Sequence, residues 1–121
     1  AHYNEYDFFY LHIKDLDKAG EDGDFDAKKK AIEAVDRLLV RLDDLPDKVV
    51  IVTGDHSTPA VMRGHSFHPV PFLINGRLVR PDATRDFTET SAAAGSLGRF
   101  PAREILPLAL AHAGRLKKFG A

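Results

Sequence analysis

The stretch VVIVTGDHSTP, residues 49–59, decides the fold of this chain. Its first four residues are a short β-branched apolar run, which predicts a buried strand. Asp55 and His56 follow this run, so we expect them beyond the carboxyl end of the strand, where open α/β sheets bind ligands. Together with His65 on the following loop, they can ligate a divalent cation suited to phosphate chemistry. The simpler alternative is a turn that carries surface histidines.

Strand and helix patterns alternate around this stretch. Residues 6–13, YDFFYLHI, are continuously apolar and aromatic, which is typical of a strand covered on both faces of a parallel sheet. Residues 14–26 are acidic and contain glycines, which predicts a loop. A helix capped by Asp24 or Asp26 should follow and end before Pro46. This order predicts a right-handed parallel unit, and therefore an α/β fold with mostly parallel strands and flanking helices.

The C-terminal half predicts less regular elements. Residues 70–74 read as a strand whose start is irregular because of Pro69 and Pro71, and Asn75 and Gly76 read as a turn after it. Residues 91–95 are compatible with a helix, and residues 102–119 predict a terminal helix perturbed at Pro107.

Composition excludes several classes of protein. Among 121 residues, 17 Lys and Arg oppose 18 Asp and Glu, so no net field favours nucleic acid or a membrane surface. The chain has no cysteine, which rules out disulfides and thiolate metal sites. Its apolar runs are shorter than the roughly 20 residues of a membrane span. We expect a cytoplasmic protein without nucleic-acid or membrane partners.

The acidic segment supplies further candidate ligands. Asp17 follows the first expected strand as Asp55 follows the second, and parallel neighbours would bring both to one edge of the sheet. Glu21 lies four residues after Asp17 and directly after Gly20. The glycine permits a tight turn that would bring both carboxylates toward one metal centre. Asp17, Glu21, Asp55, His56 and His65 are thus the candidate metal ligands. For the two acidic residues, a solvated loop is the plain alternative.

Three cations near these loops can bind a phosphate or carboxylate of a substrate: Lys14, Arg63 and Arg99. Each can equally be a solvated surface residue. Ser57 and Ser66 neighbour the histidines, but a serine in a turn usually bonds to the backbone, so neither is expected to be a nucleophile.

Several blocks of the sequence carry a family resemblance. HIKDLDKAGEDGDFDAKKKAIEAVD, VVIVTGDHSTP, GHSFHPVPFLI, SAAAGSLGR and KKFGA, in this order, resemble the C-terminal part of the archaeal-type cofactor-independent (2,3-bisphosphoglycerate-independent) phosphoglycerate mutases. These enzymes belong to the alkaline phosphatase superfamily. The resemblance implies an isomerase of glycolysis and gluconeogenesis that interconverts 3-phosphoglycerate and 2-phosphoglycerate through a phosphoserine, with two divalent metal ions.

The resemblance also assigns the ligands. One metal is implied at Asp17 and His65, with Glu21 where the family has a histidine. That carboxylate makes manganese the best expectation, with magnesium or zinc as alternatives. The second metal is implied at Asp55 and His56, together with an aspartate and the serine nucleophile from a region near the N-terminus of the family's longer members.

That region has no counterpart in the sequence, so residues 1–121 are expected to be a C-terminal fragment of the metal-binding core. Its partners would be a phosphoglycerate and the remaining N-terminal part of the enzyme, and the isolated chain would be inactive. Uncovered strands should also promote homo-oligomerisation. The alternatives are a non-catalytic module that binds a metal or a phosphorylated ligand, and another metal-dependent phosphatase of the superfamily.

Overall fold

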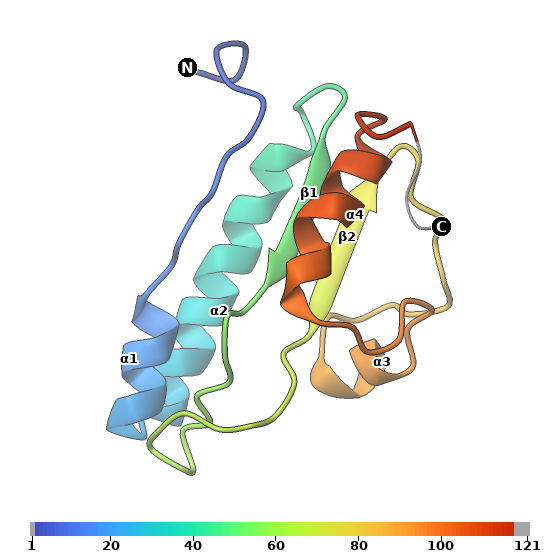
Figure 1. Ribbon diagram of the computed structural model, residues 1–121. Coiled ribbons are helices and arrows are strands. Elements are labelled where there is room, and N and C mark those ends of the chain that lie inside the picture. The colour runs from blue at the N-terminus through green and yellow to red at the C-terminus, as the bar shows by residue number, and fades with distance from the viewer. Residues whose placement is uncertain (1, 118–121) are drawn as a thin grey trace. The chain divides into compact units, whose positions relative to one another are not determined.

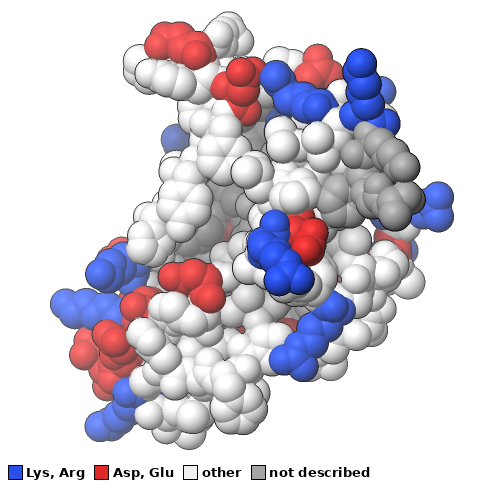
Figure 2. Space-filling view, viewed as in Figure 1, with Lys and Arg blue, Asp and Glu red and all other residues white. Residues whose placement is uncertain are grey.

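The computed structural model describes residues 2–117, which form two compact units. Within these residues, the first unit comprises residues 2–37 and Thr58–His65, and the second comprises Leu38–Ser57 and residues 66–117. Of the terminal helix expected over residues 102–119, the described helical residues end at His112; residues 118–121, which include most of the KKFGA block, lie outside the described residues. Over the face drawn in Figure 2, basic and acidic side chains are intermingled, which agrees with a net charge of −1.

The first unit contains two helices, α1 (Asp15–Asp22) and α2 (Phe25–Leu39), of which the last two residues of α2 fall in the second unit. Gly23 ends α1 in the left-handed conformation at φ 74°, which glycine adopts without strain. Asp24 then caps α2, because its carboxylate accepts a hydrogen bond from the Ala27 amide at 2.8 Å. The predicted cap is confirmed.

The prediction of a loop over residues 14–26 is wrong, because most of this segment is helix α1. Charge suggested a loop, but the apolar side of the helix is small: Ala19 and Gly20 are buried, while Glu21 and Asp22 are exposed. Two small residues are sufficient to form the buried side of α1, because the backbone of Thr58 lies directly against Gly20.

The strand predicted over residues 6–13 is absent from the part of the chain that the structure describes, where these residues belong to no helix or strand. A strand requires a neighbour with which to exchange backbone hydrogen bonds. Its large side chains are exposed, with Tyr10 at 76% and Leu11 at 78%. Tyr3 and Phe9 stack with ring centroids 6.1 Å apart, but this contact does not cover the segment.

The second unit is built on a two-stranded sheet of β1 (Val49–Thr53) and β2 (Phe72–Gly76). The strands pair antiparallel, with Ile51 opposite Ile74, so the predicted mostly parallel sheet is not seen within residues 2–117. The reason lies in the connection: residues 54–71 contain no crossover helix, so the chain returns in the opposite direction. The α/β composition is as predicted. The strand predicted over residues 70–74 instead begins at Phe72, after Pro71, and ends at Gly76, so Asn75 and Gly76 belong to the strand and not to a turn.

Short helical segments complete the second unit: η1 (Val40–Leu42), α3 (Glu89–Ala93), η2 (Ala102–Glu104) and α4 (Ile105–His112). Helix α4 packs against β1 (Figure 1). Pro107 lies in its first turn, where its missing N–H has no helical acceptor in any case. The ring of Phe72 meets Phe100 edge to face at 5.0 Å. Within residues 2–117, no helix is long and apolar enough to cross a membrane.

Candidate metal centre

Two carboxylates project from the same side of α1. Asp17 and Glu21 stand four residues apart in this helix, which places both side chains on one face. The tight turn expected at Gly20 is not formed, since Gly20 lies inside α1, and it is the helical period that brings the two carboxylates together. Asp17 is the more enclosed of the two, with its side chain 27% exposed against 52% for Glu21.

His65 completes a three-residue cluster within the first unit. Its Nε2 atom lies 3.5 Å from Asp17 Oδ1 and 3.5 Å from Glu21 Oε1. Neighbouring ligands that each lie ~2.1 Å from a metal ion are about 3.0 to 3.4 Å apart in octahedral and tetrahedral geometry. Each of the two separations from the His65 nitrogen is therefore close to the spacing of neighbouring ligands around one divalent cation. We call Asp17, Glu21 and His65 the carboxylate–histidine cluster.

The chemistry of this donor set narrows the cation. Two carboxylate oxygens and one imidazole nitrogen form a hard to borderline set of ligands, and the chain has no thiolate to add. Such a set of ligands is suited to Mn²⁺ or Mg²⁺. It differs from the ligand set of a structural zinc site, which usually consists of four cysteine or histidine side chains. An ion bound here would supply Lewis acidity.

Thr58 supports this cluster and was missed in the sequence. It is 4% exposed, and its hydroxyl donates a hydrogen bond of 2.7 Å to Asp17 Oδ1. Its carbonyl oxygen accepts a hydrogen bond from Lys28 Nζ. The sequence feature that could have identified Thr58 is its position directly before Pro59. A residue before proline is held in an extended conformation, so its side chain takes a defined direction.

The Asp55–His56 pair belongs to the second unit. Both residues follow the end of β1, as the sequence predicted. His56 Nε2 lies 3.6 Å from Asp55 Oδ2, and the His56 amide donates a hydrogen bond of 3.1 Å to Asp55 Oδ1. Asp55 is 72% exposed at its side chain, so its carboxylate is accessible to a cation. Their role as ligands stays a prediction.

The serines beside these histidines have structural contacts. Ser57 and Ser66 form an antiparallel bridge, in which the Ser66 amide donates to the Ser57 carbonyl at 2.9 Å. The Ser57 hydroxyl donates to the carbonyl of His68, and Ser66 Oγ lies 2.9 Å from His68 Nδ1. These contacts close the loop that leads from β1 to β2.

The three predicted substrate-binding cations fall in different places. Lys14 is the exposed N-cap of α1, and Arg63 has a left-handed backbone at φ 50° with its side chain against Gly23. Both belong to the unit that holds the carboxylate–histidine cluster. Arg99 is an exposed residue of the second unit. Substrate binding by these residues stays a prediction.

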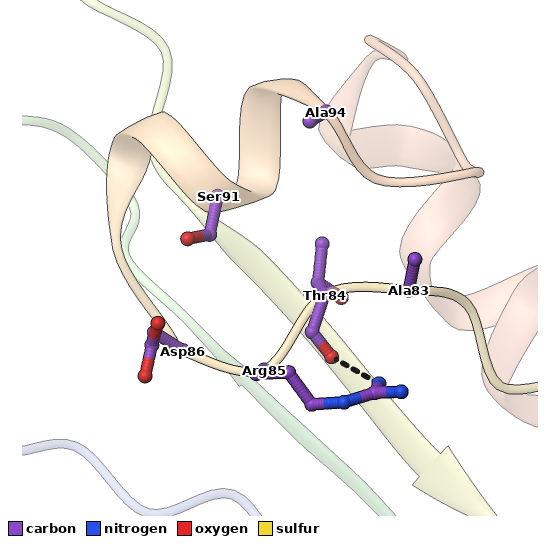
Figure 3. A pocket seen from close by; sticks show the side chains of 6 residues that line it. All are labelled: Ala83, Thr84, Arg85, Asp86, Ser91 and Ala94. Atoms are coloured by element: carbon purple, nitrogen blue, oxygen red, sulfur yellow. Dashed lines mark hydrogen bonds between the residues drawn. The ribbon is translucent and has the colours of Figure 1, made fainter.

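A pocket of about 340 Å³ opens in the second unit and contains none of the predicted site residues (Figure 3). Its lining residues are Ala83, Thr84, Arg85, Asp86, Ser91 and Ala94. The Arg85 guanidinium donates hydrogen bonds to the carbonyls of Asp82 and Thr84 at 3.1 and 3.0 Å. Arg85 therefore stabilises the backbone of the loop to which it belongs.

Asp82 organises the same loop. The Thr84 hydroxyl, the Ser96 amide and the Thr84 amide all donate hydrogen bonds to its carboxylate. These bonds hold the pKa of Asp82 well below its ordinary value, with the Thr84 hydroxyl as the largest cause. The carboxylate thus ties residues 82–84 to the turn at residue 96.

Comparison with known proteins assigns the chain to a family. Residues 1–112 match the Metalloenzyme superfamily, and the chain belongs to it. The match includes the carboxylate–histidine cluster and the Asp55–His56 pair.

Individual relatives are more specific. The chain is 57% identical over 119 residues to a probable 2,3-bisphosphoglycerate-independent phosphoglycerate mutase of Thermosipho africanus, and 49% identical to a protein of the same name from Thermus thermophilus. Each match covers 98% of this chain, which spans about 30% of the length of these relatives. The PH0037 protein from Pyrococcus horikoshii superposes with a TM-score of 0.90 at 42% identity, over 98% of this chain and 37% of that one.

Proposed function

We propose that this chain is the metal-binding C-terminal portion of a 2,3-bisphosphoglycerate-independent phosphoglycerate mutase. The observation that carries the proposal is the convergence of Asp17, Glu21 and His65, with the imidazole nitrogen 3.5 Å from both carboxylates. The names of relatives at 49–57% identity supply the reaction. The chain covers only about 30% of their length, so the activity would be that of a longer protein.

In this proposal the chain contributes two sets of ligands. The carboxylate–histidine cluster holds one Mn²⁺ or Mg²⁺, and the Asp55–His56 pair contributes to a second site. The cations bound by these carboxylates would neutralise charge on a transferred phosphoryl group. The serine nucleophile and the other ligands of the second ion would come from the part of the relatives' length that the chain does not cover. Lys14, Arg63 and Arg99 would bind the phosphoglycerate.

The proposal is tested first by metal binding. Titration of the 121-residue chain with Mn²⁺, followed by the electron paramagnetic resonance signal of the free ion, should reveal a site that Glu21→Gln and Asp17→Asn weaken strongly. Glu33→Gln and Asp36→Asn are matched controls, because both residues are exposed on α2. Equal affinity in all variants would reject the cluster as a metal site.

The reaction is tested in the intact gene product. Interconversion of 3-phosphoglycerate and 2-phosphoglycerate, coupled to enolase, should require a divalent cation and should be lost in Asp17→Asn. Cation-dependent hydrolysis of phosphate esters without interconversion would instead make the protein a phosphatase of the same superfamily.

A further inference from the structure

Thr58 is a buried polar residue beside the carboxylate–histidine cluster, and both its hydroxyl and its carbonyl are engaged in hydrogen bonds. A threonine hydroxyl has a single proton to donate. Here that proton is directed to Asp17 Oδ1 at 2.7 Å, a short bond of the kind expected between a hydroxyl and a carboxylate. Oδ1 is also the carboxylate oxygen that lies 3.5 Å from the His65 imidazole.

The position of this hydroxyl is fixed from several sides. Lys28 binds the Thr58 carbonyl through its ammonium group. Gly20 leaves room for the same carbonyl, since a Cβ atom there would collide with it and would lie 3.0 Å from Thr58 Cγ2. Pro59 disfavours a helical backbone at Thr58. The residue therefore has little freedom to turn its hydroxyl away from Asp17.

We propose that Thr58 is a positioning residue of the metal centre. Its hydroxyl fixes the rotamer of the Asp17 carboxylate, so that this ligand is already oriented toward the cation between Glu21 and His65. The inference rests on the proposed metal-binding function. Hydrogen bonds from non-ligand residues to metal ligands commonly change metal affinity by about 10- to 100-fold, because an unsupported ligand must lose its rotational freedom on binding.

The competing explanation is packing, in which the threonine methyl group fills space beside Gly20. Thr58→Val and Thr58→Ser separate the two roles. The valine keeps the shape and removes the donor, whereas the serine keeps the donor and removes the methyl group.

The experiment uses the 121-residue chain with Mn²⁺ titration and with the visible absorption of bound Co²⁺, which reports the number and geometry of the ligands. Thr58→Val should weaken Mn²⁺ binding by roughly 10- to 100-fold and change the Co²⁺ spectrum. Thr58→Ser should bind like the unaltered chain and keep its spectrum. Unchanged binding in Thr58→Val, or an equal loss in Thr58→Ser, would overturn the proposal.

Two further variants separate the possible failures. If Thr58→Val does not fold, Thr58→Ala and Thr58→Ser make the same comparison at smaller volume, since they differ only by the hydroxyl. Asp17→Asn reports on the metal site itself. If Asp17→Asn binds Mn²⁺ as well as the unaltered chain does, the proposed metal centre fails and the role of Thr58 fails with it. If only the Thr58 variants are without effect, the metal centre stands and Thr58 is a packing residue.

Discussion

Replacing Gly20 by alanine tests the close contact between α1 and the Thr58 segment. In an exposed helix this change stabilises by up to about 1 kcal/mol, because alanine has the higher helix propensity. Here the new Cβ would strike the Thr58 carbonyl oxygen and lie 3.1 Å from Lys28 Nζ. Overpacking of this kind costs about 1 to 3 kcal/mol. The colliding atom belongs to the backbone and cannot rotate away, so we expect the overpacking cost to exceed the gain in helix propensity, with a net destabilisation of up to about 2 kcal/mol.

The assay is urea denaturation of the metal-free chain, followed by far-ultraviolet circular dichroism. Lys18→Ala is the matched control, since Lys18 is exposed in the same helix and its replacement reports propensity without a clash. The Mn²⁺ affinity of Gly20→Ala should fall as well, because a displaced Thr58 no longer directs its hydroxyl at Asp17. An alanine variant at least as stable as the unaltered chain would refute the close packing of these two segments.

Three other predictions concern the remainder of the chain. The lowered pKa of Asp82 means that its stabilising contribution is fully present above the unfolded pKa near 3.8 and is lost as the pH falls below it. Stability measured against pH should therefore fall less steeply below about pH 4 in Asp82→Asn, and an identical profile would contradict the role of this carboxylate. Asp24→Ala should lower the free energy of unfolding by about 1 kcal/mol, because the α2 cap is lost. Asp26→Ala is the control, since it removes an acidic side chain from the first turn of the same helix but leaves the Asp24 cap in place. The exposed apolar segment 6–13 should cause self-association in sedimentation at high concentration, which Leu11→Glu should reduce; a strictly monomeric chain would count against it.

Local signals in the sequence were sufficient for several elements. The β-branched run predicted β1, and the proline at position 71 correctly marked the irregular approach to β2. Asp24 was a correct cap because capping depends only on a side chain and the amides that follow it within one turn. Such features need no information from distant residues.

The errors share a different cause. The charge of residues 14–26 predicts a loop, whereas the packing of Gly20 against Thr58, which accompanies the helix, has no signature in a linear pattern. The parallel pairing expected between residues 6–13 and 49–52 is not seen within residues 2–117, where β1 and β2 pair antiparallel, because strand pairing depends on how the connections run in space. The segment 6–13 has the composition of a covered strand, but residues 2–117 provide no strand that pairs with it.

The sequence by itself determined which chemistry is available. It supplied the candidate ligands Asp17, Glu21, Asp55, His56 and His65, together with the family resemblance, because residue types and their order are written in the chain. Only the tertiary structure decided that His65 meets Asp17 and Glu21, and that the Thr58 hydroxyl donates a hydrogen bond to Asp17. The physical reason is that a metal centre depends on distances of a few ångströms between residues far apart in the chain, and these distances follow from packing and not from spacing along the sequence.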